Sequence, residues 1–478
     1  MKTLILRADG NSKIGLGHLY RLKAIGEYFE RKTQILFLSK DNLEGIIPSN
    51  WDIVRFEDQD EITFIKNNFH PNTATFVLDG YNFDQYYQQK LKECGFEIAF
   101  IDDFHSFSML ADVVINPSIA VSSSDYSGSS RLALGAHFSP LRNEFLSVSK
   151  SKISYETTII EKVFISLGGS DNNLSTKIIN EINQLEGINQ VHLMVGNSFN
   201  DQPLADKTYN FDLKIHKRLS ANQIIDLVEK CDFAISSAST ISYELCSCRI
   251  PLAIGWYTEN QKDLYTGLVQ KGLAEGLGNI NSISRENLGV KLQEVLGKSF
   301  SNQIKRQIEV FSGLNKENIM SVIYPLLSDL EIVEASKNDL MRYFDWANDK
   351  EVRMNSFTSE PILLADHKKW FERKLKQDTC FLLMAKIGDD FAGQLRFDLN
   401  ENRFEIGYSI DKNHRGKGFG TEIIACGIHY LRKKGIKQDI RAKVKSDNFA
   451  SISVFKKLGF MPVVNHESTE MLIFDYYL

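Results

Sequence analysis

The sequence predicts an α/β protein with two Rossmann-like halves followed by a smaller α/β domain. Short apolar runs alternate with helical stretches through roughly the first 330 residues, and this alternation starts again near residue 162. A different pattern, a strand followed by a glycine loop and a helix, lies in the last third. Since 478 residues suffice for about three domains, we expect domains at 1–150, 151–328 and 329–478.

Five apolar runs mark the first half as a parallel sheet. They read TLILRA, TQILFLS, TFVLDG, EIAFIDD and ADVVINP. Most end in polar or glycine residues, and helical stretches separate them. Fully apolar strands that alternate with helices are typical of a parallel sheet covered on both faces.

The pattern starts again with KVFISLGGSD and continues with QVHLMVGN, DLKIHKR, CDFAISSAS and PLAIGWY. The polar, serine-rich stretch SVSKSKISYETT separates the two halves and is interpreted as a hinge. A helix at about 315–328 is expected to close the second half. EIVEAS is then expected to open the third domain with little linker.

The composition excludes several classes of protein. Hydrophobic residues make up 43% and charged residues 24%, as in globular proteins, and a net charge of −5 argues against non-specific nucleic-acid binding. No apolar stretch approaches 18 residues and the N-terminus lacks a signal-peptide pattern, so no membrane insertion is expected. Six scattered cysteines predict reduced thiols in a cytoplasmic protein, and no metal site is expected.

The motif RADGNSKIGLGHLYR contains a candidate catalytic residue. A strand ends at Arg7, a glycine loop follows, and a helix begins near His18. The glycines, Gly17 among them, allow close backbone approach to phosphates. The positive end of a helix disfavours an imidazolium, so a neutral His18 could act as a general base. The alternative is a capping or core histidine, which the neighbouring glycine loop makes less favoured.

Ligand-binding residues are expected at the carboxyl ends of strands in the second half. Gly169 and Ser170 offer backbone donors for a phosphate. The hydroxyls of Ser239 and Thr240 suit a phosphate or a sugar, although simple helix capping is an equally good explanation for them. Three further candidates are Glu244, which could bind ribose hydroxyls, and Asn260 and Gln261 at the sheet edge.

Over residues 1–325 the chain resembles the GT-B-fold UDP-sugar hydrolases of pseudaminic acid biosynthesis. The resemblance rests on RADGNSKIGLGHLYR, LDGYNFD, FIDD, LGAHFSPLRNEF, SLGGSD, ISSAST and ENQ. It implies UDP-2,4-diacetamido-2,4,6-trideoxy-β-L-altropyranose as substrate, His18 as the catalytic base, and Tyr81 and Asn260 in the active site. UDP would lie against Gly169, Ser170, Ser239, Thr240 and Glu244. MurG-type glycosyltransferases are similar more distantly.

The resemblance implies hydrolysis by a single displacement with inversion. His18 would activate water to attack the anomeric carbon from the face opposite the pyrophosphate. UDP is a good leaving group, so neither a covalent carboxylate nor a metal is required. Asp102 and Asp103 could suggest a metal-binding pair, but a solvated or capping pair at a strand end is favoured.

The third domain contains a glycine-loop motif. The strand FEIGYSI runs into R-x-x-G-x-G at Arg415, Gly418 and Gly420, and a helix follows. The glycines, the free N–H groups and the positive helix end suit a pyrophosphate. A second motif, DNFASISVFKKLGF, lies downstream.

Together these motifs resemble the acetyl-CoA-binding core of the GNAT acetyltransferase superfamily. The resemblance implies acetyl-CoA as cosubstrate and the 4-amino group of a UDP-linked sugar as acceptor. In pseudaminic acid biosynthesis, acetylation of this 4-amine directly precedes the loss of UDP. The implied acetyl-CoA-binding residues are Tyr408, Ser409, Ile410, Arg415, Gly416, Lys417, Gly418, Phe419, Gly420 and Asn448.

One residue departs from the superfamily pattern. Phe455 stands where many members carry the tyrosine that would protonate the departing thiolate, and phenylalanine cannot do so. Either another group such as Tyr408 serves, or the thiolate leaves without an acid. Glu405 is a candidate base, but it could equally be a strand residue facing water.

Two other functions are compatible with the sequence. A MurG-like glycosyltransferase would share the fold and the UDP site, with another acceptor in place of water. A non-catalytic nucleotide-sugar-binding protein is disfavoured by His18, Asn260 and the intact glycine loop. The sequence leaves open the stereochemistry of the sugar, the acyl group and the oligomeric state.

Overall fold

The computed structural model describes residues 2–11, 15–56, 60–128, 130–149, 159–168, 174–196, 199–205, 207–463 and 470–476. The chain forms two compact units. The first is Thr3–Ile319, and the second is Met320–Leu478 together with Met1–Lys2. Part of the expected hinge, residues 150–158, lies outside the described residues.

The first half of the Thr3–Ile319 unit is a parallel sheet of order β3-β2-β1-β4-β5-β6-β7. Its strands are β1 (Thr3–Arg7), β2 (Ile35–Ser39), β3 (Asp52–Arg55), β4 (Ala74–Asp79), β5 (Glu97–Ile101), β6 (Val113–Asn116) and β7 (Arg131–Leu134). Its helices are α1 (Gly17–Phe29), α2 (Glu61–Asn68), α3 (Gln85–Glu93) and α4 (Asn143–Ser149), with short 3-10 turns at Ser123–Asp125 and Ala136–Phe138.

The second half repeats this design with the strand order β10-β9-β8-β11-β12-β13. Its strands are β8 (Lys162–Ser166), β9 (Gln190–Val195), β10 (Asp212–Lys217), β11 (Phe233–Ser237), β12 (Leu252–Trp256) and β13 (Glu275–Asn279). Its helices are α5 (Leu174–Ile182), α6 (Gln202–Ala205), α7 (Ala221–Val228), α8 (Thr240–Ser247), α9 (Lys262–Gln270), α10 (Arg285–Leu296), α11 (Ser301–Val310) and α12 (Asn315–Leu327), with a 3-10 turn at Glu259–Gln261.

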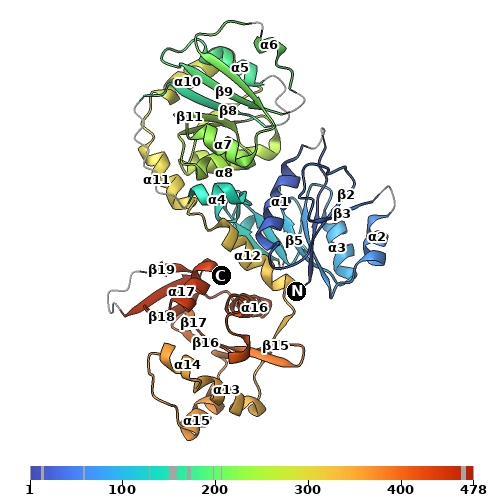
Figure 1. The fold of residues 1–478 in the computed structure, drawn as a ribbon, viewed down its shortest axis with the longest axis vertical. Helices are drawn as coiled ribbons and strands as arrows, with labels where there is room; N and C mark the ends of the chain where they lie inside the picture. The colour runs from blue at the N-terminus through green and yellow to red at the C-terminus, as the bar shows by residue number, and fades with distance from the viewer. Residues whose placement is uncertain are drawn as a thin grey trace. The chain divides into compact units, whose positions relative to one another are not determined.

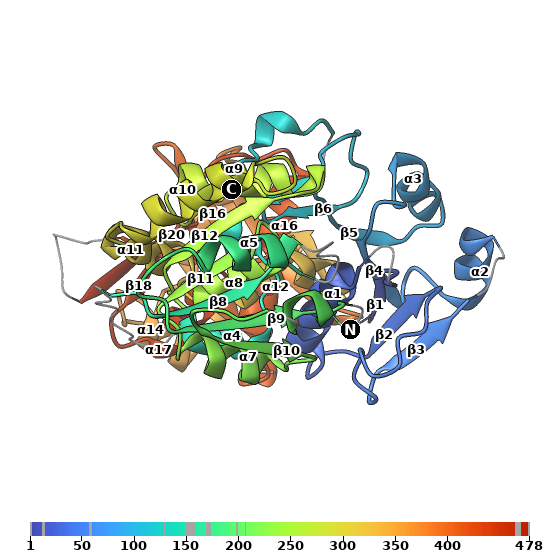
Figure 2. The same ribbon diagram turned by 90° about the horizontal axis from the view of Figure 1, so that it is seen from above.

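In both sheets the strand order reverses direction beside the first strand, at β1–β4 and at β8–β11. Right-handed crossovers then place successive helices on opposite faces, as Figure 1 and Figure 2 show for α1 and α3. Open α/β sheets bind ligands outside the carboxyl ends of the strands at such a switch point. The fold therefore indicates where a site belongs in each half.

The Met320–Leu478 unit is a mixed sheet of order β14-β15-β16-β17-β18-β20-β19. Its strands are β14 (Leu330–Glu334), β15 (Cys380–Ile387), β16 (Asp390–Asn400), β17 (Arg403–Ile410), β18 (Ile440–Lys445), β19 (Met461–Val463) and β20 (Met471–Tyr476). Its helices are α13 (Leu340–Ala347), α14 (Lys350–Asn355), α15 (Leu364–Lys374), α16 (Phe419–Lys433) and α17 (Phe449–Lys457), with 3-10 turns at Lys337–Asp339 and Lys412–His414.

Alternation along β15 divides the core of this unit into two layers. Leu383 and Ala385 pack in the cluster that contains residues of α16 and α17. Leu382 and Met384 point the other way, into the cluster with Tyr343 of α13 and residues of α15. The sheet is thus covered by helices on both faces.

These observations confirm the predicted fold class, a GT-B-like pair of Rossmann-like domains followed by an α/β acetyltransferase-type domain. The predicted closing helix and the strand at EIVEAS are α12 and β14. In the two Rossmann-like sheets, three edge strands were missed, namely β3, β7 and β13. They are short and lie at or next to solvent, and β13 reads EGLGN, so they lack the apolar run that marks a buried strand.

Two features are absent from the described part of the chain. None of its helices is long and apolar enough to cross a membrane. No group of three or more His, Cys, Asp or Glu side chains there could hold a metal ion. All six cysteines are free thiols.

The Met320–Leu478 unit contains a buried ionic cluster that should make its stability depend on pH. Asp475 of β20 accepts hydrogen bonds from Arg441, at 2.8 Å from both Nε and Nη2, and from Arg403. The hydrogen bonds from Arg441, more than the opposing effect of burial, hold the pKa of Asp475 below its usual range. The ion cluster therefore stabilises the fold fully above the ordinary carboxyl pKa of about 4, and this stabilisation is lost as the pH falls from there through the lowered pKa of Asp475 in the folded chain.

Asp475→Asn is accordingly expected to destabilise this unit by about 1–2 kcal/mol at pH 7, and by less below about pH 4. The figure is modest because the arginine side chains are 39% and 28% exposed. Calorimetry of the whole chain checks this, with acetyl-CoA added to identify the transition that the ligand shifts. The control Asp212→Asn removes an exposed ion pair with Lys214 and should change little. An equal destabilisation at pH 3 and pH 7 would contradict the ionic explanation.

Candidate active sites

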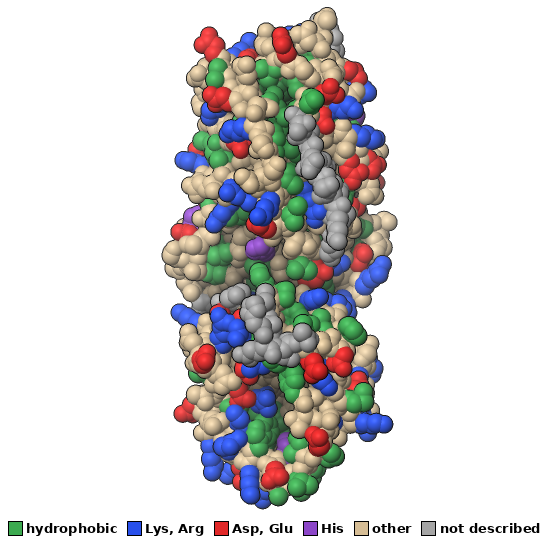
Figure 3. Space-filling model, turned by 90° about the vertical axis from the view of Figure 1, so that its left-hand side faces the viewer, with side chains coloured by type: hydrophobic (Ala, Val, Ile, Leu, Met, Phe, Trp, Pro, Cys, Tyr) green, Lys and Arg blue, Asp and Glu red, His purple; other side chains and the backbone are tan. Residues whose placement is uncertain are grey.

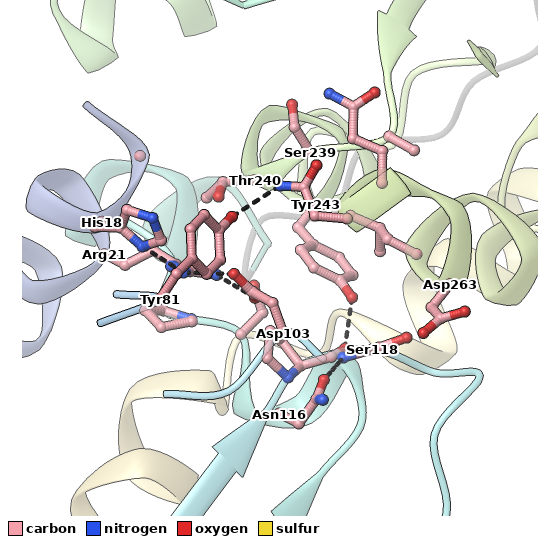
Figure 4. A pocket seen from close by; sticks show the side chains of 18 residues that line it. His18, Arg21, Tyr81, Asp103, Asn116, Ser118, Ser239, Thr240, Tyr243 and Asp263 are labelled. Atoms are coloured by element: carbon pink, nitrogen blue, oxygen red, sulfur yellow. Dashed lines mark hydrogen bonds and ion pairs between the residues drawn. The ribbon is translucent and has the colours of Figure 1, made fainter. Parts of the chain in front are cut away.

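A pocket lies between the two halves of the Thr3–Ile319 unit, and we call it the central pocket (Figure 4). It is lined by Gly17, His18, Arg21, Tyr81, Asp103, Asn116, Pro117, Ser118, Ser139, Pro140, Ala238, Ser239, Thr240, Tyr243, Asn260, Gln261, Asp263 and Leu264. These residues lie at or after the carboxyl ends of β4, β5, β6, β7, β11 and β12 or belong to α1, α8 and α9. The pocket therefore occupies the position that the sheet topology indicates.

Seven of the residues expected from sequence line this one pocket. They are Gly17, His18, Tyr81, Ser239, Thr240, Asn260 and Gln261. Gly169 and Ser170 lie outside the described residues. Residues separated by more than 200 positions thus meet around a single space.

The surroundings of Glu244 differ from those expected of a ribose-binding residue. It is buried on α8, and its two carboxylate oxygens accept hydrogen bonds from Nε and Nη2 of Arg142, each at 2.7 Å. Arg142 precedes α4 in the first half, so the pair ties the two halves together. Glu244 is not among the residues that line the central pocket.

His18, in the first turn of α1, is held by a buried carboxylate. Its Nδ1 lies 2.7 Å from Oδ1 of Asp79, at the end of β4, and Asp79 is fully buried. Asp79 also accepts hydrogen bonds from Nε and Nη2 of Arg21, and Nη2 of Arg21 lies 2.9 Å from the same Nδ1 of His18. Because the Asp79 carboxylate can only accept, we assign the ring proton of His18 to Nδ1, from which it donates to Asp79. That tautomer leaves Nε2 as a proton acceptor, the form that a general base requires.

Arg21 connects Asp79 to a second carboxylate, Asp103. Nη1 and Nη2 of Arg21 donate to the two oxygens of Asp103 at 2.7 and 2.9 Å. Burial alone would raise the pKa of Asp103, but the charge and hydrogen bonds of Arg21 outweigh it and hold the pKa below its usual range. The single positive charge of Arg21 thus faces two carboxylates, which leaves one negative charge unbalanced. A proton taken up by His18 during the reaction would balance that charge.

Tyr81 and Asn260 meet across the pocket. Nδ2 of Asn260 donates to the Tyr81 hydroxyl at 2.9 Å, and the Tyr81 ring lies edge-on to the His18 ring, with centroids 4.9 Å apart. Burial, and next the negative charge of Asp103, raise the pKa of Tyr81 to about 12. Tyr81 is therefore a neutral phenol at neutral pH, able to donate a hydrogen bond.

The start of α8 faces the pocket from the second half (Figure 4). Ser239 is the N-cap residue but makes no side-chain cap bond, and its hydroxyl pairs with that of Ser237 at 3.0 Å instead. Simple capping therefore does not explain Ser239. With Thr240 as the first helical residue, this helix end presents backbone N–H groups and a positive dipole end to the pocket.

The candidate acetyl-CoA site lies in the other unit, in the loop between β17 and α16. Gly416 and Gly418 have φ values of +72° and +86°, a conformation that residues with a Cβ rarely adopt. Gly418 is the N-cap residue of α16 and makes no side-chain cap bond. The loop therefore leads directly into a helix N-terminus suited to a pyrophosphate.

The strands beside this loop separate. β17 and β18 pair in parallel only from Phe404–Ile440 to Ile406–Ala442, although β17 continues to Ile410 and β18 to Lys445. The separated part of β17 contains the expected residues Tyr408, Ser409 and Ile410. A wedge of this kind exposes strand-edge backbone groups with which an extended chain can pair.

The remaining expected residues surround the loop and the wedge. Nη2 of Arg415 donates to Asp349 at 2.7 Å and its Nη1 donates to Glu351 at 2.9 Å, and both acceptors belong to the α14 region. Asn448 caps α17 by accepting from the Ser451 N–H. Lys417, Phe419 and Gly420 lie in the loop and the first turn of α16.

Phe455 is buried on α17, edge-on to the Tyr408 ring with centroids 5.7 Å apart. The Tyr408 hydroxyl lies 3.0 Å from that of Ser451. Burial raises the pKa of Tyr408, so its phenol holds its proton at neutral pH. The candidate base Glu405 forms an ion pair with Lys443.

Sequence reasoning missed the roles of Asp79, Arg21 and Asp103. Two signals could have found them. Asp79 and Asp103 each follow an apolar strand run, where a carboxylate reaches the ligand edge of the sheet. Arg21 lies three positions after His18 on the same helix face.

We expect the left-handed conformation of Gly418 to be needed for acetyl-CoA binding. Gly418→Ala should weaken binding about tenfold, because the added Cβ disfavours the loop geometry that presents the N–H groups. Calorimetric titration of acetyl-CoA measures this. Gly435→Ala is a matched control, since Gly435 has a φ of +78° but lies beyond the far end of α16. Equal weakening in both variants would mean that only general strain was measured.

Comparison with known proteins agrees with this division of the chain. Residues 329–461 match the family model of the acetyltransferase (GNAT) domain. The uncharacterized protein MJ1062 of Methanocaldococcus jannaschii is 23% identical over 492 residues, which cover 96% of each chain. The SPbeta prophage-derived uncharacterized N-acetyltransferase YokL of Bacillus subtilis is 26% identical over 145 residues, covering 30% of this chain and 81% of YokL.

Among solved structures, MurG of Acinetobacter baumannii is 12% identical, with a TM-score of 0.45 over 66% of this chain and 95% of MurG. The match to the family model covers the region in which the glycine loop and the separated strands lie. The C-terminal part of the chain is therefore a GNAT acetyltransferase domain, and it follows a GT-B-like pair of Rossmann-like domains.

Proposed function

We propose that this chain is a bifunctional enzyme that acetylates a UDP-linked amino sugar and then removes UDP by hydrolysis. The acetyltransferase domain would transfer the acetyl group of acetyl-CoA to the 4-amine of a UDP-4-amino-4,6-dideoxy sugar. The Rossmann-like pair would hydrolyse the resulting UDP-2,4-diacetamido-2,4,6-trideoxy-β-L-altropyranose with inversion. The observation that carries the hydrolytic part is the Asp79–His18 contact of 2.7 Å at the wall of the central pocket.

In the proposed hydrolysis, Nε2 of His18 takes a proton from water as its oxygen attacks the anomeric carbon. The C–O bond to the diphosphate breaks, and UDP leaves as an anion. Asp79 stabilises the imidazolium that forms, because it accepts the Nδ1–H hydrogen bond throughout. The N–H groups at the start of α8 would stabilise the charge on the departing diphosphate.

The size of the central pocket indicates which part of the UDP-sugar it can hold. Its volume of about 170 Å³ is below the roughly 300–1,000 Å³ of typical ligand sites. We therefore infer that the pocket holds the reacting sugar end. The nucleotide would extend beyond it along the second half.

In the proposed acetyl transfer, the neutral 4-amine attacks the thioester carbonyl, a C–N bond forms and the C–S bond breaks. The amine loses a proton to solvent, and the CoA thiolate gains one. Tyr408 is the candidate donor, because its hydroxyl lies beside Phe455 at the wedge and keeps its proton at neutral pH. The glycine loop and the start of α16 would hold the pyrophosphate of CoA.

A glycosyltransferase with a UDP-sugar donor is the second candidate. It would use the same base and diphosphate site, with an acceptor hydroxyl in place of water. Enzymes that take an acceptor from a membrane often carry a basic or apolar docking patch. On the face in Figure 3, Lys and Arg side chains are interspersed with Asp and Glu.

The test is to incubate the purified chain with the UDP-4-amino sugar, with and without acetyl-CoA, and to follow sugar and UDP by NMR. Free diacetamido sugar and UDP that form only with acetyl-CoA would support both activities and their order. Acetylated sugar that stays attached to UDP would overturn the hydrolase proposal and favour the transferase. No reaction with this or other UDP-4-amino sugars would overturn both parts.

A further inference from the structure

Asp103 is a charged residue of the central pocket that the proposed mechanism does not use. It follows β5, and its side chain remains 19% exposed although it contacts Arg21. Each of its oxygens accepts one hydrogen bond from Arg21, whereas a carboxylate oxygen can accept two. Further acceptor capacity therefore remains on this carboxylate, which lines the central pocket.

The charges around Asp103 limit what it can face. Asp79 and Asp103 share the single cation of Arg21, so the three side chains together are negative. A diphosphate beside this cluster would be repelled. The helix end that suits a diphosphate belongs to α8 in the opposite half. Asp103 is therefore placed to meet the part of the ligand that carries hydrogen-bond donors and no negative charge.

Two aromatic contacts place Asp103 on the same side of the central pocket as His18, the proposed base. The Tyr81 ring lies 4.9 Å from that of His18 and 5.2 Å from that of Phe104, the residue after Asp103. The guanidinium of Arg21 contacts both Asp103 and the carboxylate that holds His18. The sugar carbon that His18-activated water attacks must lie on this side of the pocket.

We propose that Asp103 is a specificity-determining residue that accepts a hydrogen bond from a donor on the sugar ring, either the N–H of the 2-acetamido group or the 3-hydroxyl. This inference rests on the proposed hydrolase function and deepens it. A buried acceptor that loses its donor is left unpaired, so such a residue discriminates strongly against analogues that lack the donor.

Asp103 could instead act only on Arg21, as a positioning residue for the Asp79–His18 pair. The two roles differ in one measurable respect. A residue that only positions Arg21 slows every substrate by the same factor. A residue that binds the sugar donor loses its effect when that donor is removed from the substrate.

The experiment is a cycle of two enzymes and three substrates. Wild type and Asp103→Asn are assayed with the UDP-diacetamido sugar, with its 3-deoxy analogue, and with an analogue whose 2-acetamido N–H is replaced by an ester oxygen. With the full substrate, Asp103→Asn should lower kcat/KM about 10- to 100-fold, because the amide offers donors where the sugar needs an acceptor. With the analogue that lacks the contacted donor, the two enzymes should differ by less than about threefold.

Binding of UDP alone is measured in parallel. Its Kd should be the same in both enzymes, because Asp103 is assigned to the sugar end. Asp125→Asn serves as the charge-matched control, since it removes an exposed capping carboxylate of the first half and should leave kcat/KM unchanged. The asparagine introduced there can still cap.

The outcomes separate this inference from the proposed function. If wild type releases free sugar but Asp103→Asn slows all three substrates equally, the specificity role is overturned and the hydrolase stands. A weakened Kd for UDP would likewise overturn the assignment to the sugar end. If wild type hydrolyses none of the substrates, the proposed function fails and this inference fails with it.

Discussion

His18→Asn is expected to lower the rate of UDP release by about 10³-fold, within the range that general-base catalysis contributes. Asparagine can occupy the position of the imidazole and accept a hydrogen bond from water, but it cannot take up the proton. The Kd for UDP should change little, because the diphosphate site is assigned to the other half. Acetyl transfer should be unchanged, since its residues belong to another unit.

The measurement is single-turnover release of UDP from the diacetamido substrate. His70→Asn is the matched control, because His70 is an exposed histidine of the same half that does not line the central pocket. UDP release that survives His18→Asn unchanged would remove His18 from the mechanism. Equal losses in both variants would indicate damage to the fold.

Asp79→Asn is expected to lower the same rate by about 10² to 10³-fold although it leaves His18 in place. The Asn amide would donate to Nδ1 and stabilise the tautomer with its proton on Nε2, so the pocket side of the ring would lose its lone pair. The comparable substitution in a serine protease triad has an effect of about 10⁴. Loss of the negative charge of Asp79 would also leave the imidazolium of His18 without the carboxylate that stabilises it.

A fold control is needed here because Asp79 is buried and also holds Arg21. Calorimetry and the Kd for UDP should show that Asp79→Asn remains folded and binds. Asp84→Asn is the matched variant, since Asp84 caps α3 and asparagine caps equally well. Normal turnover by a folded Asp79→Asn chain would show that the contact with His18 is not used in catalysis.

Long-range packing explains why the interior strands of the two Rossmann-like sheets could be predicted and three of their four edge strands could not. TFVLDG and KVFISL are buried on both faces, so their apolar runs are visible in the sequence as β4 and β8. β3 and β13 lie at the edges of their sheets, where solvent relaxes the demand for apolar residues. Their existence depends on a neighbour to pair with, which local sequence does not record.

The two candidate sites also differ in how far the sequence alone could predict them. The glycine loop before α16 is local, because a strand, the positive-φ glycines and a helix start are contiguous in the chain. The central pocket is not local, since its residues come from several strand ends in two sheets. Resemblance to a family could name His18, Tyr81 and Asn260, but it did not reveal which carboxylates contact which cations.

The sequence by itself determined the α/β class, the repeated strand–helix pattern and the positions of the glycine loops, because hydrophobic period and glycine placement act within a few residues. Only the tertiary structure decided that Asp79 holds His18, that Arg21 joins Asp79 to Asp103, and that Glu244 pairs with Arg142 outside the pocket lining. Such contacts join residues 58 to 102 positions apart. They depend on burial and charge balance, which exist only once the sheets and helices have packed.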